Sequence, residues 1–217
     1  MIGRTVLLAM TLGGCCTGCR SLALSHGRDY MNRGQRAYDA GNYASARDYF
    51  KRAIEIDPGI ASRHGSLALA FWKLGDLEDA RREGEMSTRQ APDASPGHTN
   101  LSLIYFSSNR YQDARREAET ALRLSPRDRY AWGALGSACI SLRDYATAAK
   151  ACRTAFALDP TDDIARINYG VALFDRGQES EGIEQWKYVA EHGTKRRASA
   201  IARLKRHGIV WPPKASR

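Results

Sequence analysis

Apolar residues recur along most of the chain at the spacing of an amphipathic helix. In residues 129–162 a first stretch follows the pattern i, i+3, i+4, i+7, which places its apolar side chains on one helix face. A break at Arg143-Asp144 separates it from a second stretch of the same kind. The two faces comprise Trp132, Leu135, Gly136 and Cys139, and then Tyr145, Ala148, Cys152 and Ala155. Several of these residues are small, so the pattern predicts two antiparallel helices that pack closely.

The same scheme repeats with a period of 34 residues. Its clearest marker is a proline near the end of the second helical stretch in four successive units. These residues are Pro58, Pro92, Pro126 and Pro160. Counting from them gives five units, of which the fifth lacks the proline, at 27–60, 61–94, 95–128, 129–162 and 163–194. A regular period of this length is typical of helical repeat proteins.

A short break separates the two helical stretches of every unit. The breaks fall at Gly41-Asn42, Gly75-Asp76, Asn109-Arg110, Arg143-Asp144 and Gly177-Gln178. Gly and Asn suit the left-handed backbone conformation that ends a helix. In four of the units the break is followed by Tyr43, Leu77, Tyr111 or Tyr145, and then by Ala46, Ala80, Ala114 or Ala148. We therefore expect each unit to fold as a helix-turn-helix hairpin.

This order of Gly, aromatic residue, Ala and Pro resembles the tetratricopeptide repeat family, most closely over residues 40–58. The resemblance covers about residues 27–194 and implies an all-α fold, an α-solenoid of about five repeats that binds proteins. Residues 195–207 predict a further helix, because Gly208 ends it and Pro212-Pro213 prevents a restart. We expect residues 195–217 to form a basic capping helix and tail that cover the last apolar surface.

The N-terminus is typical of an export signal. Arg4 precedes the apolar run 6–12, which is far shorter than the ~20 residues of a bilayer span. Leu12-Gly13-Gly14-Cys15 resembles the lipobox of bacterial lipoproteins. That resemblance implies a signal peptide at 1–14, a lipid on Cys15, a tether over 15–26 and an extracytoplasmic protein held on a membrane, at the periplasmic face if there is an outer membrane. An ordinary secretory signal with incidental cysteines is the alternative.

Positive charge is concentrated at the C-terminal end. The formal net charge is +9, to which residues 192–217 contribute +8 and residues 1–20 contribute +2. The remainder is close to neutral, so we expect no nucleic-acid partner. The basic residues on the predicted capping helix are Lys195, Arg196, Arg197, Arg203, Lys205 and Arg206. Their charge exceeds what capping requires, and anionic lipid is an alternative partner for them.

The histidines and cysteines are not arranged for catalysis or metal binding. His64 and His98 occupy equivalent places in adjacent units, where Trp132 follows, so we expect them to pack between helices. They are accompanied by no phosphate-binding loop or nucleophile motif. Cys139 and Cys152 fall on the buried faces of one hairpin, where they are either two free thiols or the two halves of a disulfide. The sequence predicts a protein that is not an enzyme and needs no cofactor or metal.

A second ladder of mostly aromatic residues recurs on the first helix of each unit, beside the buried stripe. It comprises Tyr38, Trp72, Phe106, Ile140 and Phe174. Neighbouring residues extend it into a predicted groove with Leu69, Asn100, Leu103, Ile167, Asn168 and Val171. First helices line the concave surface in the tetratricopeptide repeat family, so the resemblance implies that this groove takes an extended peptide or a helix of a partner protein. Packing on the next helix is the alternative.

Carboxylate capture, as in the chaperone-tail adaptors of the family, is not expected in this groove. The equivalent positions here are Met31, Gly65, Thr99, Gly133 and Ile167, none of which is basic. Partner binding should therefore depend on apolar side chains. The sequence as a whole loosely resembles pilotin-like lipoproteins, which implies a membrane-anchored adaptor in the assembly of an envelope, secretion or pilus complex. A lipid- or polyanion-binding module that acts through the basic helix is the alternative.

Overall fold

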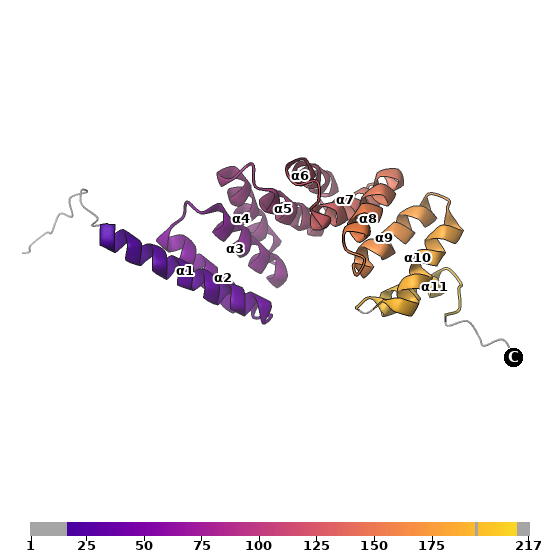
Figure 1. Ribbon diagram of the computed structural model, residues 1–217, viewed down its shortest axis with the longest axis horizontal. Coiled ribbons are helices and arrows are strands. Elements are labelled where there is room, and N and C mark those ends of the chain that lie inside the picture. The colour runs from indigo at the N-terminus through magenta and orange to yellow at the C-terminus, as the bar shows by residue number, and fades with distance from the viewer. Residues whose placement is uncertain (1–16, 194, 212–217) are drawn as a thin grey trace, which may run out of the picture.

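A computed structural model describes residues 17–193 and 195–211 of the 217-residue chain. These residues form helices joined by short connections, with no β-strand among them, and the helices follow one another in an arch (Figure 1). The helices are α1 (Thr17–Asp39), α2 (Tyr43–Ile56), α3 (Ala61–Leu74), α4 (Leu77–Gln90), α5 (Ser95–Ser107), α6 (Tyr111–Leu124), α7 (Arg129–Ser141), α8 (Tyr145–Leu158), α9 (Asp163–Asp175), α10 (Glu179–His192) and α11 (Arg197–Arg206). The predicted all-α solenoid of five helix pairs and a further C-terminal helix is confirmed.

The N-terminal predictions fall only partly on described residues. The predicted signal peptide and Cys15 lie outside them. From Thr17 onward the segment predicted as a tether is helical and belongs to α1, which runs without interruption to Asp39. Among the described residues, none of the helices has the length and apolar character of a bilayer span.

Each helix pair turns at a residue with a positive φ angle, and each of these residues opens one of the predicted breaks. The angle is 80° at Gly41, 87° at Gly75 and 93° at Gly177, where the missing side chain makes it accessible. Asn109 and Arg143 adopt φ angles of 58° and 60° despite their side chains. The connection between α7 and α8 thus holds an arginine in a conformation that L-residues rarely adopt.

The repeated prolines contribute hydrogen-bond acceptors to the joints between pairs. The carbonyl oxygen of Pro92 faces Nε2 of His98 at 2.9 Å, and that of Pro126 accepts from Trp132 Nε1 at 2.8 Å. His64 meets the carbonyl of Pro58 in the same way, at 3.2 Å. One side chain in the first turns of a helix therefore binds the loop that precedes it.

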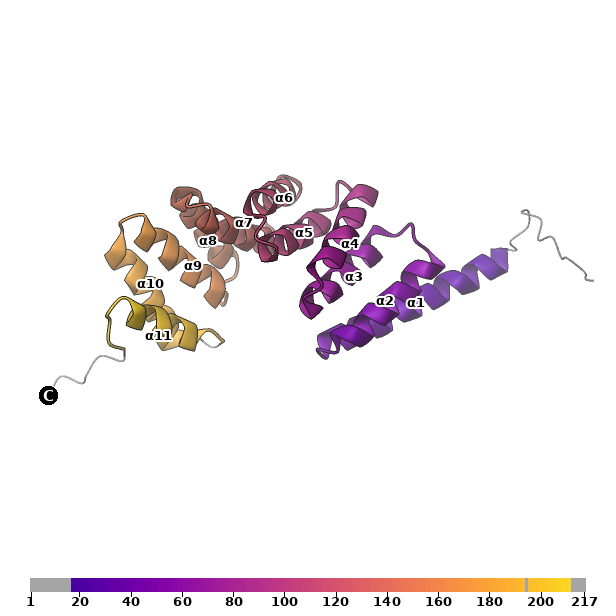
Figure 2. The same cartoon turned by 180° about the vertical axis from the view of Figure 1, so that it is seen from behind.

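First helices lie along the inside of the arch. The helices α3, α5, α7 and α9 contact one another in succession, while α4, α6, α8 and α10 pack behind them (Figures 1 and 2). A chain of buried clusters, rich in alanine, fills the space between the two layers. We call the inner side formed by the first helices the concave face.

The final helix covers the apolar end of the last pair. Ala200 and Leu204 of α11 are fully buried against α10, in the cluster that also contains Trp186. Behind this layer, the indole of Trp186 donates to the carbonyl of Ile167 at 3.1 Å. The expected capping position of the C-terminal helix is what the structure shows.

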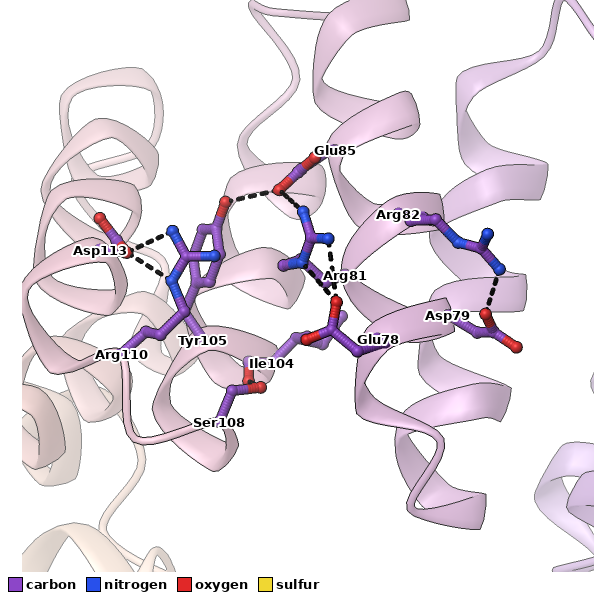
Figure 3. A network of polar contacts seen from close by, with 10 residues as sticks. All are labelled: Glu78, Asp79, Arg81, Arg82, Glu85, Ile104, Tyr105, Ser108, Arg110 and Asp113. Atoms are coloured by element: carbon purple, nitrogen blue, oxygen red, sulfur yellow. Dashed lines mark hydrogen bonds and ion pairs between the residues drawn. The ribbon is translucent and has the colours of Figure 1, made fainter.

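Polar side chains also join neighbouring pairs (Figure 3). The Tyr105 hydroxyl of α5 donates to Glu85 of α4 at 3.0 Å, and Arg81 donates to the same carboxylate at 2.7 Å. Burial raises the pKa of Tyr105 to about 12, and the bond to Glu85 acts in the same direction. Burial also opposes ionisation of Glu85, but the hydrogen bonds from Arg81 and Tyr105 outweigh it and lower its pKa. This network therefore links the second pair to the third.

Candidate functional site on the concave face

The predicted aromatic ladder is only half exposed. Its five residues are all partly buried, and each packs within its own pair or on the next. Trp72 donates from Nε1 to Ser107 Oγ of the following pair at 2.7 Å. Phe174 stacks on Trp186 with ring centroids 5.3 Å apart and lies 4.3 Å from the ring of His207. The ladder thus serves packing between helices as well as the surface.

The other predicted groove residues separate into two groups. Ile167 and Val171 are buried, with 5% and 8% of their surface exposed, so their side chains belong to the core of the fifth pair. Leu69, Leu103, Asn100 and Asn168 are half-buried. The Asn168 side chain bridges two pairs, since its Nδ2 donates to Ser137 Oγ at 3.2 Å. A partner on the concave face can reach the second group but has little access to the first.

A hollow of about 840 Å³ opens over α7 and α9. Leu103 of α5 contributes to its wall, and the segment between α10 and α11 supplies its edge. Its most exposed apolar side chains are Tyr130, with 61% of its surface exposed, and Ile164, with 48%. The residues that line it include Leu103, Arg129, Tyr130, Gly133, Ser137, Asp159, Asp162, Asp163, Ile164, Asn168, Lys195 and Arg196.

Sequence reasoning missed Tyr130 and Ile164. They are 34 residues apart and so are equivalent positions in the fourth and fifth units. Each stands at the second residue of its helix, ahead of the periodic apolar stripe that was used to find the core. An apolar residue at that place in two successive units was the available signal.

The carboxylates of the hollow are all engaged. Asp159 forms an ion pair with Arg129. Asp162 caps α9, because its Oδ1 accepts from the backbone N–H groups of Ile164 and Ala165, each at 3.0 Å. These acids therefore stabilise the fold at the rim and leave the apolar side chains as the accessible surface.

Most of the basic residues predicted on the C-terminal helix face solvent, but α11 begins at Arg197, so Lys195 and Arg196 precede it. Lys195, Arg196, Arg197, Lys205 and Arg206 are exposed. The guanidinium of Arg203 is half-buried, and burial together with the neighbouring Arg206 lowers its pKa, although Asp175 acts in the opposite sense. The cationic surface is therefore made by the other five.

The two repeated histidines occupy buried joints. Nδ1 of His64 lies 2.7 Å from Glu83, and Nδ1 of His98 lies 2.7 Å from Glu117. With the proline carbonyls on their other nitrogens, both rings are held on two sides, in line with the expected packing role. Among residues 17–193 and 195–211, no group of three His, Cys, Asp or Glu residues is placed to hold a metal ion.

The two buried cysteines are protonated thiols of low reactivity. Cys139 and Cys152 are free thiols with no exposed surface. Burial raises the pKa of Cys139 to about 11 and that of Cys152 to about 12. Both remain protonated near neutral pH, and so they act as small apolar residues of the fourth pair.

Comparison with known proteins agrees with the helix-pair architecture. A model of the tetratricopeptide repeat matches residues 31–95, 99–163 and 140–193, which is most of the chain. The chain belongs to the tetratricopeptide repeat family. Proteins of this family are generally adaptors that bind other proteins without catalysing a reaction. Among curated proteins, no sequence matches the chain.

Several solved structures of the family have the same fold. A thermophilic repeat protein of Thermus thermophilus is 23% identical, with a TM-score of 0.69 over 81% of this chain and 99% of that one. PilF of Pseudomonas aeruginosa is 19% identical, with a TM-score of 0.70 over 87% of this chain and 93% of its own. MamA of Desulfovibrio magneticus RS-1 is 19% identical, with a TM-score of 0.66 over 76% and 94%. At these identities the likeness concerns the fold alone.

Proposed function

We propose that this tetratricopeptide repeat protein is a membrane-anchored, non-enzymatic adaptor that holds a segment of a partner protein on its concave face. One observation carries the proposal, namely the hollow with Tyr130 and Ile164 exposed on the inside of the arch. Apolar side chains grouped on a concave surface are typical of sites that bind an extended peptide or a helix. The carboxylates of the hollow are engaged in an ion pair, a helix cap and hydrogen bonds to the backbone, which serves structure rather than catalysis.

The anchor in this proposal is a lipid on Cys15. The lipobox-like residues 12–15 support it, and α1 begins two residues after that cysteine, at Thr17. A lipid there would hold the arch close to the extracytoplasmic face of a membrane. The resemblance to pilotin-like lipoproteins favours a role in assembling an envelope, secretion or pilus complex.

Affinity capture from native membranes tests whether the partner binds on the concave face. Tyr130→Ser combined with Ile164→Ser should reduce the captured partner about tenfold or more, because two apolar contacts are lost while the core is untouched. Met86→Ser with Leu124→Ser is the control, since these apolar side chains are also exposed, at 37% and 39%, but lie on second helices. Equal recovery with both double variants would exclude the concave face as the binding surface.

The anchor has its own readout. Cys15→Ser should move the protein from the membrane to the soluble fraction, and mass spectrometry of the wild-type N-terminal peptide should find an acylated Cys15. An unmodified peptide, with the variant still on the membrane, contradicts the anchor and leaves the groove result unaffected.

A second candidate function is binding to an anionic membrane surface through α11. Lys205 is exposed at a smaller apolar depression that is also lined by Trp211 and by Val210, of which 68% is exposed. Arg206, the next residue of α11, is exposed as well. Basic residues near an anionic surface contribute about 1 kcal/mol each, and an apolar neighbour can insert beside them.

Vesicle sedimentation tests this second function. Lys205→Glu with Arg206→Glu should weaken binding to phosphatidylglycerol-containing vesicles at least tenfold and leave phosphatidylcholine vesicles unbound. Arg89→Glu with Arg123→Glu, at exposed positions on α4 and α6, keeps the same net charge as a control. If both double variants sediment alike, only the overall charge matters and α11 has no specific part.

A further inference from the structure

The hollow on the concave face contains space that packing does not require. Gly133 lies inside α7, and a Cβ atom built there would meet nothing within 4 Å. One turn later, at Gly136, a Cβ atom would lie 2.3 Å from the sulfur of Cys152, so that glycine is needed for the two helices to approach. A glycine inside a helix destabilises it relative to alanine. Gly133 therefore leaves room in the hollow without a benefit to the fold.

The cations at the edge of the hollow are held in place by their backbone. Oδ2 of Asp163, at the start of α9, accepts from the N–H groups of Lys195 and Arg196 at 3.2 and 3.3 Å. This bond fixes the segment between α10 and α11 against the hollow. The donors of Lys195 and Arg196 in these two bonds are backbone N–H groups, so the bonds do not occupy the ammonium and guanidinium groups.

These two cations have no acidic partner within the described part of the chain. Both side chains are exposed and line the hollow. The nearby acids Asp159, Asp162 and Asp163 are already committed to an ion pair, to a helix cap and to the backbone of the 195–196 segment. The hollow thus combines an open apolar wall with two positive charges at one edge.

We infer that the hollow binds an extended segment of a partner protein in which a bulky apolar side chain stands within a few residues of one or more carboxylates. The apolar side chain enters beside Gly133, between Tyr130 and Ile164. The carboxylate meets Lys195 and Arg196. This inference rests on the proposed adaptor function and names the chemistry of the segment that the concave face selects.

The inference differs from what the repeat register implies. The positions at which related adaptors place basic residues are not basic here, and on that ground carboxylate capture was not expected. The structure supplies cations from the segment between α10 and α11, outside the first helices. Recognition of an acidic group is therefore available at the end of the arch and not along its length.

A peptide-display experiment tests this chemistry directly. Random dodecapeptides displayed on phage are selected on the purified full chain, and recovered peptides are measured by fluorescence polarisation. We expect recovered sequences to combine an aromatic or long aliphatic residue with a nearby Asp or Glu. Sequences without acidic enrichment, or enriched in Lys and Arg, overturn the inference.

Two substitutions in α7 locate the binding site. Gly133→Leu should weaken the recovered peptides at least tenfold, because its side chain fills the open space without touching the core. Gln112→Leu adds the same side chain at an exposed position on α6 and should leave affinity unchanged. Gly133→Ala should raise the melting temperature, which shows that the position tolerates a side chain. Equal peptide affinity in the Gly133→Leu and wild-type proteins overturns the placement.

Charge reversal tests the cationic edge. Lys195→Glu with Arg196→Glu keeps the backbone bonds to Asp163 and should reverse the selected preference, from acidic to basic peptides. Arg89→Glu with Arg123→Glu has the same net charge and should retain the acidic preference.

The outcomes separate the two proposals. If Gly133→Leu abolishes binding while charge reversal changes nothing, the adaptor function stands and the acidic specificity is wrong. If selection yields no peptide whose binding depends on Gly133, the concave-face function itself is wrong.

Discussion

Replacing Trp186 by alanine should lower the free energy of unfolding by about 3–5 kcal/mol, the usual loss for a large aromatic side chain in a core. Only 1% of this residue is exposed, and its indole stacks on both Phe174 and His207 with centroids 5.3 Å away. The substitution also removes the hydrogen bond to the Ile167 carbonyl. Urea denaturation followed by circular dichroism gives the loss. Hydrogen exchange should show protection lost first in α9, α10 and α11, since repeat arrays lose structure locally.

Trp132→Ala provides the comparison for that experiment. Trp132 is half-buried and makes its hydrogen bond to the Pro126 carbonyl near the surface. Trp132→Ala should lower the free energy of unfolding by less than half as much as Trp186→Ala, and it should leave hydrogen-exchange protection in α9 and α10 unchanged. Equal losses for the two tryptophans would contradict the view that Trp186 holds the C-terminal end together.

Trp186 is matched in size by a glycine on the first helix of its pair, and the repeat period does not determine this match. A Cβ atom at Gly170 would lie 2.5 Å from Trp186 Nε1, and one at Gly34 would lie 2.5 Å from the ring of Phe50. Both glycines stand 16 residues before their partners, at equivalent places in the fifth and first units. A large residue on the second helix thus requires a glycine on the first helix.

The architecture could be predicted from the sequence because the same helix-pair pattern occurs in five successive units. Every predicted break contains a residue with positive φ, including Arg143, whose residue type alone gives no such signal. A turn was predicted at Arg143 because this residue occupies the position of Gly41 and Gly75 in the earlier units. A conformation unfavourable for one residue can therefore be predicted when its equivalents are glycine.

The functional surface was harder to predict, because it depends on contacts that the period does not encode. Lys195 and Arg196 reach the hollow through their backbone bonds to Asp163, which lies more than 30 residues earlier in the chain. From the sequence they belonged to a basic tail. Their place beside Tyr130 and Ile164 follows only from how the segment after α10 folds back.

The aromatic ladder shows a second limit of the pattern. Periodicity placed Trp72 and Phe174 beside the main stripe, but it could not distinguish a partly covered side chain from an open one. Trp72 donates a hydrogen bond to Ser107 of the next pair, and Phe174 stacks on Trp186. Alanine variants in this ladder therefore change stability together with binding. Exposed residues such as Tyr130 give a cleaner test of partner capture.

The joint between the first two pairs depends on one buried arginine. Arg63 of α3 has 3% of its surface exposed, and its Nη1 donates to the carbonyls of Ala53 and Asp57, at 2.8 and 2.7 Å. The Asp57 carboxylate lies 3.6 Å from the same nitrogen. These groups form the end of α2, where the Ala53 carbonyl also accepts the backbone N–H of Asp57 and the carbonyls that follow have no donor from a further turn of the helix. On the other side, Gly27 of α1 leaves room for the guanidinium, since a Cβ atom there would lie 3.1 Å from Nη2.

Arg63→Met should therefore lower the free energy of unfolding by about 2–3 kcal/mol, because it keeps much of the side-chain volume but leaves buried carbonyls without their charged donor. Arg63→Lys should recover only part of this loss, since an ammonium cannot reproduce the planar set of guanidinium donors. Urea denaturation measures both losses, and hydrogen exchange should place the lost protection in α1, α2 and α3. Arg33→Met, at an exposed ion pair with Asp29 on α1, is the control and should change stability by less than about 1 kcal/mol. If Arg63→Met is as stable as this control, water or a local shift satisfies the end of α2, and the first pair is held by apolar contacts alone.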